Sequence, residues 1–165
     1  MVRYRGVVPA TTPYRFGDLL ALARRSWTLA MARELDARGY GDYRVSDAAS
    51  MRMLMVGQLN IGRLAEALGV TRQAASKVAR GLEERRLAVT RVDPDDARRI
   101  RVELTASGER YAQAIVDAIA SLNRRLAEHV GSTDLAAADR VLRASLGDGP
   151  LRSAAERIPR PEERR

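Results

Sequence analysis

The sequence predicts a mainly α-helical protein that carries one small β-hairpin. Three observations lead to this class. Apolar residues recur with helical spacing over most of the chain between residues 14 and 146. Only residues 99–104 alternate polar and apolar side chains as a half-buried strand does. With 165 residues, of which 45% are hydrophobic and 30% charged, the chain is long enough for one domain with a substantial core.

The amino-terminal third is predicted to hold two helices. Residues 1–13 contain two prolines and no periodic pattern, so we expect an arm at most. The first helix should cover residues 14–38, where a Gly-Tyr-Gly-Asp sequence stops it. The second should cover residues 46–56, with Ser46 or Asp47 as its N-cap. Its methionines are expected core residues, and a methionine-lined adaptable pocket is the alternative.

The most informative part of the chain is residues 60–105. Asn60 and Thr71 are the predicted N-caps of two short helices, and Gly69 between them can take the left-handed conformation that ends the first. Two strands should follow, joined by the polar turn sequence DPDDAR. Helix, tight turn, helix and hairpin in this order form the outline of a winged helix-turn-helix. This module places its second helix in the major groove of DNA.

Two further helices are predicted after the hairpin, over residues 106–129 and 133–146. The first has an inward stripe that ends at Leu122 and Leu126. A Gly-Asp-Gly-Pro sequence should stop the second, and the proline- and charge-rich residues 148–165 are expected to fray.

The charge of the chain favours a polyanionic partner. The formal net charge is +8, and 28 of the 29 basic residues are arginines. A GC-rich genome explains the excess of arginine over lysine, but it explains the net positive charge less well. No apolar run reaches the length of a membrane span and residues 1–16 lack a secretory signal pattern, so we expect a cytoplasmic protein without a membrane partner.

The predicted helix after Thr71 has one basic and polar face. The side chains on this face are Arg72, Gln73, Ser76, Lys77 and Arg80. In the major groove, arginine pairs with guanine and glutamine with adenine, and serine contacts either base or a phosphate. The alternative is an ordinary solvated helix face. The turn before the helix and the hairpin after it favour contact with DNA.

The hairpin carries arginines beside its acidic tip. Arg91, Arg98, Arg99 and Arg101 could follow phosphates or enter a narrow minor groove. Asp96 and its acidic neighbours could orient Arg98 through a charge-assisted hydrogen bond, or could simply form the turn. A Mg²⁺ or Ca²⁺ site is disfavoured, because the DPDD sequence lacks the alternating ligands of a calcium loop.

Two stretches give the chain a resemblance to a known family. The sequence LAEALGVTRQAASK, and more selectively DPDDARRIRVELTASG, resemble the MarR (multiple antibiotic resistance regulator) family of bacterial transcription factors. The resemblance implies a homodimer that reads a pseudo-palindromic DNA site, typically as a repressor. It places Arg72, Gln73, Ser76 and Lys77 on the recognition helix and Arg98 in the minor groove, oriented by Asp96. Many members bind a small hydrophobic ligand and release DNA.

The resemblance also assigns roles to the segments of the chain. After the arm, residues 14–45 would serve dimerisation, residues 46–105 would form the DNA-binding region, and residues 106–147 would complete the dimer interface. Together with the helix face and the hairpin, it completes the set of expected DNA-binding residues: Thr71, Arg72, Gln73, Ser76, Lys77, Arg80, Arg91, Asp96, Arg98 and Arg99.

Three features depart from the family pattern. Arg86 stands where a helix-ending glycine is usual, so the exit of the recognition helix should be shaped differently. The stretch before Asn60 is about one turn short, which should alter the ligand cavity. The chain has no cysteine, which excludes the branch of the family that senses peroxide with a thiol.

Two other classes of function fit the sequence less well. A winged-helix module that binds protein or RNA would keep the fold, but no exposed aromatic cluster is expected that could stack on unpaired bases. An enzyme is rejected, since the chain has one histidine, His129, no cysteine and no glycine-rich phosphate loop. His129 is expected near a helix end, where it suits the helix dipole. No cofactor or metal is expected.

Overall fold

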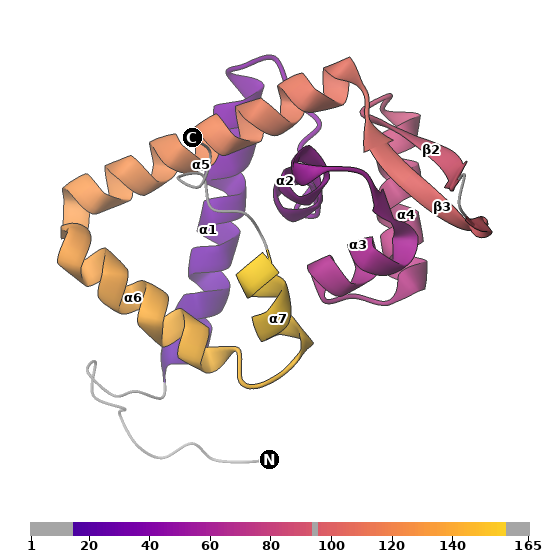
Figure 1. Ribbon diagram of the computed structural model, residues 1–165. Coiled ribbons are helices and arrows are strands. Elements are labelled where there is room, and N and C mark those ends of the chain that lie inside the picture. Colours follow the sequence, from indigo (N-terminus) through magenta and orange to yellow (C-terminus); the bar gives the residue numbers. More distant parts are fainter. Residues whose placement is uncertain (1–14, 94–95, 158–165) are drawn as a thin grey trace, which may run out of the picture.

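The computed structural model confirms a mainly helical protein with a small antiparallel sheet (Figure 1). It describes residues 15–93 and 96–157, of which residues 97–99 and 150 are described by their backbone alone. The arm predicted for residues 1–13 lies outside this part. The elements are α1 (Phe16–Asp36), α2 (Asp47–Val56), β1 (Leu59–Asn60), α3 (Ile61–Leu68), α4 (Arg72–Glu84), β2 (Ala88–Asp93), β3 (Asp96–Leu104), α5 (Ala106–Val130), α6 (Ser132–Ser145) and α7 (Pro150–Arg157).

The helices are arranged in two lobes joined by the long helix α5. One lobe contains α2, α3, α4 and the sheet, which lie together at the amino-terminal end of α5 (Figure 1). In the other lobe α1 crosses α5 and α6 turns back from its carboxyl-terminal end. The first lobe has the predicted winged helix-turn-helix arrangement.

Two predicted N-caps and one predicted helix stop are confirmed, and α5 begins at Ala106 as predicted. The Asn60 Oδ1 accepts from the Arg63 N–H at 2.9 Å, and the Thr71 Oγ1 accepts from the Ala74 N–H at 3.2 Å. Thr105 caps α5 in the same way. Gly69 ends α3 with a φ of 65°. These local signals therefore set the short turn between α3 and α4.

Ser46 occupies the N-cap position of α2, one of the two residues predicted for it, but it does not cap the helix with its side chain. Ser46 has helical backbone angles and makes no side-chain cap. Asp47 is completely buried, and its carboxylate accepts from the backbone N–H of Arg44, which precedes the helix. The reason is tertiary, since the same carboxylate also binds an arginine from α4.

The sheet contains one strand more than the sequence predicted. Its order is β1-β3-β2, and the short β1 pairs Leu59 with Val102 and Asn60 with Arg101. Val102 is fully buried, as the alternation predicted, but Ile100 is 48% exposed. The inward position predicted for Ile100 is wrong, because the hairpin extends beyond the helices that cover its base.

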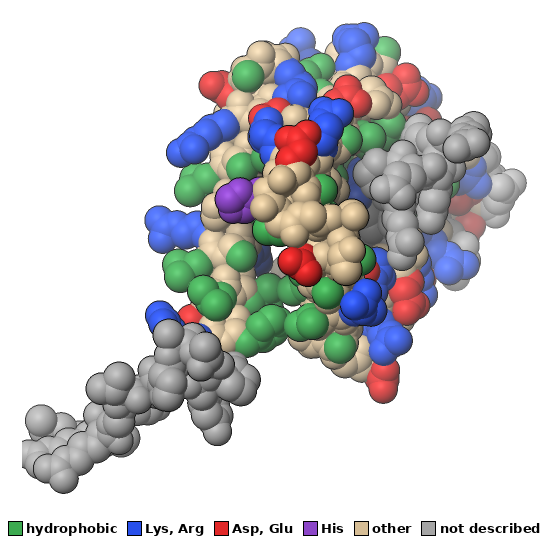
Figure 2. Space-filling model, turned by 90° about the vertical axis from the view of Figure 1, so that its left-hand side faces the viewer, with side chains coloured by type: hydrophobic (Ala, Val, Ile, Leu, Met, Phe, Trp, Pro, Cys, Tyr) green, Lys and Arg blue, Asp and Glu red, His purple; other side chains and the backbone are tan. Residues whose placement is uncertain are grey.

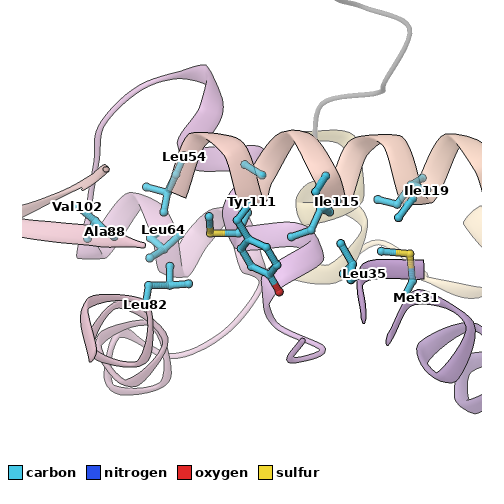
Figure 3. Close-up of a cluster of buried hydrophobic side chains, with 14 of the residues drawn as sticks. Met31, Leu35, Leu54, Leu64, Leu82, Ala88, Val102, Tyr111, Ile115 and Ile119 are labelled. Atoms are coloured by element: carbon cyan, nitrogen blue, oxygen red, sulfur yellow. The ribbon is translucent and has the colours of Figure 1, made fainter. Parts of the chain in front are cut away.

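One continuous core runs beneath α5. Figure 3 shows Leu54, Leu64, Leu82 and Val102 of the winged helix-turn-helix at one end of this core, and Met31 and Leu35 of α1 at the other. Tyr111 and Ile115 of α5 line the region between them, and Ile119 lies beside Met31 and Leu35. The predicted inner stripe of α5 is buried as far as Leu122, whereas Leu126 is 39% exposed. Of the methionines of α2 that were expected in the core, Met51 is fully buried, whereas Met53 and Met55 are half-buried.

The frayed tail predicted from residue 148 is in part a helix. Residues 150–157 form α7, which lies against α3 with Ala154 buried. The Arg157 Nη1 donates to the Glu66 carbonyl near the end of α3 at 3.3 Å. Proline at the first position suits a helix start because its missing N–H would be unpaired there anyway. The same Pro150 was expected only to break α6.

The exit of α4 has the form that a glycine would provide, although its left-handed residue is Arg86. Arg86 has a φ of 57°. The Arg86 N–H donates to the Glu83 carbonyl at 2.8 Å, and the Leu87 N–H donates to the Leu82 carbonyl at 2.9 Å. This bond pair is the one that ends helices at a left-handed glycine. The different exit expected from Arg86 is therefore not observed, and the arginine adopts the unfavourable conformation.

We expect Arg86→Gly to raise the free energy of unfolding by about 1 kcal/mol, because glycine adopts a positive φ without the steric cost that a Cβ brings. Urea unfolding at fixed protein concentration measures this. Arg86→Ala is the matched control, since it removes the same long side chain but keeps the Cβ. An equal gain from alanine would show that the side chain, and not the backbone conformation, limits stability.

Candidate nucleic-acid interface

The outward face of α4 is basic and polar. Ala75, Ala79 and Leu82 are buried on the inner face of the helix. On the other face Thr71, Arg72, Gln73, Lys77 and Arg80 are exposed, and Ser76 is half-buried. The structure thus brings together every residue that the sequence predicted for this helix. The inner alanines explain the arrangement, because small side chains let α3 approach α4 closely.

Acidic side chains do not neutralise this face. Glu83 at the end of α4 accepts from the backbone N–H and the hydroxyl of Thr90 in β2, at 3.2 and 2.9 Å. Within the described residues, no ion pair is formed by Arg72, Lys77 or Arg80. Their charges are therefore available to an anionic partner, and the carboxylate of Glu83 holds the hairpin to the helix.

A groove of about 610 Å³ lies beside the recognition face, between α3, α4 and the hairpin. A Cβ added to Gly62 of α3 would lie 3.7 Å from the Arg72 guanidinium, so the side chain of Arg72 reaches back against α3 there. Ile100, which is 48% exposed, lines the groove from β3. Its lining residues are Asn60, Ile61, Gly62, Arg63, Glu66, Arg72, Ser76 and Ile100.

The predicted arginines of the hairpin are only partly described. Arg91 is exposed on β2, with its Nε 3.9 Å from the Glu103 Oε2. Arg98 and Arg99 lie in β3, and their side chains fall outside the described part of the structure. Asp96 begins β3 opposite Asp93. The expected bond between Asp96 and Arg98 therefore stays a prediction.

Arg101 anchors the base of the hairpin, although the sequence suggested that it follows phosphates. Its Nη2 lies 2.6 Å from the Oδ1 of Asp93, a residue buried to 93% beside a β-bulge. The side-chain amide of Gln58, turned so that its oxygen faces Arg101, joins Arg101 to a third residue. The Gln58 amide oxygen accepts from the Arg101 Nη1 at 3.1 Å, and the Gln58 amide nitrogen donates to the Glu103 Oε1 at 2.5 Å. Sequence reasoning missed this anchor, because Gln58 and Asp93 carry no local signal for it.

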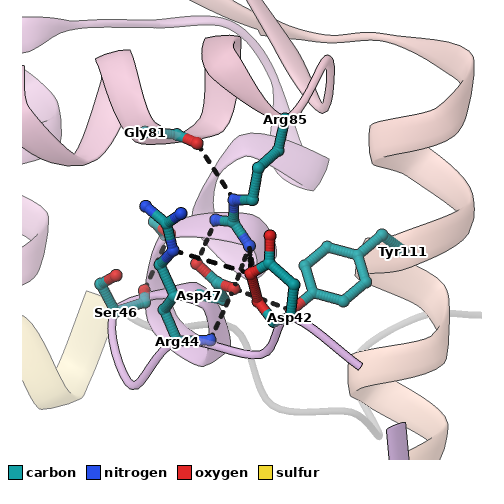
Figure 4. A network of polar contacts seen from close by, with 8 residues as sticks. Asp42, Arg44, Ser46, Asp47, Gly81, Arg85 and Tyr111 are labelled. Atoms are coloured by element: carbon teal, nitrogen blue, oxygen red, sulfur yellow. Dashed lines mark hydrogen bonds and ion pairs between the residues drawn. The ribbon is translucent and has the colours of Figure 1, made fainter. Parts of the chain in front are cut away.

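A second polar cluster lies where α4 ends, and it consists of Asp47, Arg85 and Tyr111, with Asp42 at its edge (Figure 4). The Arg85 Nη1 and Nη2 donate to the two carboxylate oxygens of Asp47 at 2.9 and 2.8 Å. The Tyr111 hydroxyl donates to the same carboxylate at 2.7 Å. Burial, together with the nearby Asp47 carboxylate, holds the pKa of Tyr111 well above its usual value, so the hydroxyl keeps its proton.

Two negative findings apply to the described residues. They contain no group of three or more histidine, cysteine, aspartate or glutamate side chains placed to hold a metal ion. Over the same residues, no helix is both long and apolar enough to span a membrane. His129 is exposed in the last turn of α5, near a helix end as expected.

Comparisons with known proteins point to one family. A family model described as the MarR family matches residues 51–99. Uncharacterized proteins of Mycobacterium tuberculosis and Mycobacterium bovis are 35% identical over 120 residues, which is 73% of this chain and 79% of theirs. The matched residues include all of α3, α4 and β2, whereas Asp47, Arg101 and Tyr111 lie outside them.

Solved structures support the same fold. The PcaV transcriptional regulator from Streptomyces coelicolor, in complex with its natural ligand, superposes with a TM-score of 0.70 at 22% identity, over 87% of this chain and 97% of that one. The S. aureus MepR–DNA complex gives 0.68 at 21% identity, over 82% and 96%. A MarR family transcription regulator, SP03579, gives 0.66 at 23% identity, over 81% and 84%.

Fold and matches together define a winged helix-turn-helix transcription regulator, and not an enzyme. The exposed basic helix, its capped turn and its hairpin are the parts that such a protein needs. The chain belongs to the MarR family.

Proposed function

We propose that the protein is a repressor that binds a pseudo-palindromic operator as a homodimer and reads DNA with the outer face of α4. The observation that carries the proposal is this face, which is basic, exposed and held rigidly by a buried inner face. MepR, one of the structural neighbours, has been solved in complex with DNA. A protein–RNA or protein–protein module is less well supported, because no exposed aromatic side chain lies on α4 or on the described part of the hairpin.

Each predicted residue has a role in this proposal. Gln73 would pair with adenine and Arg72 with guanine. Thr71, Ser76, Lys77 and Arg80 would hold phosphates beside them. In the β2–β3 hairpin, Arg91 and Arg99 would contact phosphates of the DNA backbone. Asp96 would orient Arg98 in the minor groove.

A second copy of the chain is the proposed partner of the exposed apolar face in the α1 and α6 lobe. Figure 2 looks onto this side of the molecule and shows hydrophobic side chains gathered there among arginines. Helix α6 has no buried residue at all, which is unusual for a helix with an apolar stripe. The large apolar side chains exposed on α1, α5 and α6 are Phe16, Leu19, Leu20, Leu22, Leu29, Leu126, Val130, Val141 and Leu142.

Sedimentation velocity tests the homodimer directly, because the chain has a mass of 18.2 kDa. A species of twice this mass at micromolar concentration is expected. A protein that stays monomeric when it binds its operator would contradict the proposed two-fold reading of DNA.

A small hydrophobic effector is proposed to release the DNA. An open groove of about 560 Å³ lies between the end of α2, β3 and the start of α5, and it is large enough to admit a small molecule. Leu54, Met55 and Leu104 supply apolar lining, while Glu103 and Glu109 supply carboxylates. PcaV has been solved with its natural ligand. The two carboxylates favour a neutral or cationic effector here, and a thermal-shift screen that compares such compounds with anionic analogues tests this preference.

Selection from a randomised duplex DNA library tests the function as a whole. The protein is expected to enrich a two-fold symmetric site. Failure to enrich any sequence above the starting pool, at a salt concentration where the protein is folded and dimeric, would overturn the proposed operator reading.

We expect Gln73→Ala to change the enriched sequence at one position in each half-site, where the preference for adenine is lost. The salt dependence of binding should stay nearly unchanged, because glutamine neutralises no phosphate. Lys77→Ala is the matched control, and it should weaken binding to all sequences and reduce the salt slope. If Gln73→Ala selects the same sites as the parent, this residue does not read a base.

A further inference from the structure

The carboxyl-terminal end of α4 is attached to the rest of the protein at two places. At the first, the Thr105 hydroxyl donates to the Arg86 carbonyl at 2.8 Å, and Gly108 of α5 packs directly on the Leu87 carbonyl. At the second, Arg85 binds Asp47, which Tyr111 of α5 also binds. Two separate attachments remove the pivoting that a single attachment would allow.

We infer that the polar cluster of Asp47, Arg85 and Tyr111 sets the angle of the recognition helix relative to α5, and thereby the half-site spacing that the dimer accepts. The inference rests on the proposed dimeric reading of DNA. In this arrangement the three side chains are positioning residues, and none of them needs to touch DNA.

The cluster is built to hold an orientation. The Arg85 Nε donates to the Gly81 carbonyl of its own helix at 3.0 Å, so the guanidinium is fixed to the last turn of α4. Its other two nitrogens form a forked pair with Asp47, which has no exposed surface. A forked arginine–carboxylate pair specifies angle as well as distance. Figure 4 shows Asp47 between Arg85 on one side and Tyr111 on the other.

Stability alone gives a poor reason for such a cluster. Burying an ion pair costs desolvation energy, and well-packed apolar side chains of similar volume often stabilise a protein equally well. Apolar contacts are not directional, however, and would permit α4 to rotate. The cluster also contacts the loop after α1, because the Arg85 Nη1 donates to the Asp42 carbonyl at 3.0 Å and the Tyr40 ring lies 5.0 Å from that of Tyr111. The angle of α4 is therefore fixed relative to α2, α5 and the loop after α1 together.

The length of α4 amplifies small rotations at the cluster. A helix of 13 residues is about 20 Å long. Arg72 and Gln73 lie at the opposite end from Arg85. A rotation of about 10° at Arg85 would therefore move them by about 3.4 Å, which is the rise of one base pair. A two-fold dimer contains two such helices. The polar cluster therefore controls the distance between the two recognition helices to within about one base pair.

The test uses full-length protein and synthetic duplexes built from the site that the parent protein selects from a randomised library. The spacing between the half-sites is varied by one and two base pairs in both directions, and affinity is measured for each duplex. Tyr111→Phe and Asp47→Asn are the variants. Tyr43→Phe is the matched control, because it removes the same hydroxyl from a half-buried tyrosine that makes no hydrogen bond within the described residues.

The parent protein and Tyr43→Phe should favour one spacing by about tenfold or more over its neighbours. Tyr111→Phe and Asp47→Asn should reduce this ratio several-fold, while the selected half-site sequence stays the same. A loss of folded protein alone would lower affinity at every spacing by the same factor. Parallel spacing profiles for Tyr111→Phe and the parent would overturn the inference, even if Asp47→Asn does not fold. If the parent protein selects no DNA site at all, this result contradicts the proposed function, which the inference about the polar cluster presupposes.

Discussion

Replacing Arg85 with methionine is expected to lower the free energy of unfolding by about 3–5 kcal/mol, because it leaves the buried carboxylate of Asp47 without its cationic partner. Asp47 has no exposed surface, and Arg85 supplies two of its hydrogen bonds at 2.8 and 2.9 Å. The remaining donors, Tyr111 and the Arg44 N–H, are neutral. Methionine keeps most of the volume of the side chain, so the loss reports on charge and not on packing. Urea unfolding followed by circular dichroism, at fixed protein concentration, measures it.

A double variant separates the interaction energy between Asp47 and Arg85 from the effect of changing each residue alone. Asp47→Asn together with Arg85→Met removes both charges and should destabilise less than the sum of the two single changes. Arg143→Met is the control for a partly exposed pair, since Arg143 binds the exposed Asp139 on α6 at 2.7 Å. It should change the free energy of unfolding little, because solvent screens this pair. A loss as small as this for Arg85→Met would show that water or another group solvates Asp47.

The second large effect is expected from Gly108→Ala, which should destabilise the protein by about 3 kcal/mol or more. A Cβ at this position would lie 1.8 Å from the Leu87 carbonyl oxygen and 2.9 Å from its carbon. Both are backbone atoms, so either the start of β2 or the start of α5 must move. The displaced segment directly follows α4, and binding to selected DNA should fall together with the melting temperature.

The control for this change is Gly17→Ala in α1. An added Cβ there has no heavy atom within 4 Å. Because alanine favours a helix over glycine by about 1 kcal/mol, Gly17→Ala should be neutral or slightly stabilising. Should Gly108→Ala melt at the parent temperature, the close approach of α5 to the hairpin would not be a tight constraint in solution.

Local sequence signals predicted the winged helix-turn-helix well, and the reason is physical. Asn60, Thr71 and Thr105 satisfy N–H groups within three residues of themselves, so their action depends little on the rest of the fold. The small apolar and the polar residues of α4 alternate with the period of a helix. Burying the apolar face therefore leaves the polar face exposed. For the same reason, the exposed face of α4 could be listed by residue from the sequence.

Contacts between distant segments could not be predicted in this way. Asp47 looked like a helix cap, but Arg85, 38 residues away, and Tyr111, 64 residues away, bind its carboxylate. Arg101 looked like a phosphate ligand, but Asp93 across the hairpin binds it. A charged side chain has the same sequence signature in both situations, since the partner alone decides its role.

The sequence by itself determined that this protein has a capped helix-turn-helix with a basic outer face and a hairpin behind it, because caps, turns and helical periodicity act over a few residues. The tertiary structure alone decided where that helix points. Its angle depends on a buried carboxylate that joins α2, α4 and α5 and on a glycine that lets α5 touch the hairpin. Burial gives these contacts their strength, and burial exists only once the segments have packed together.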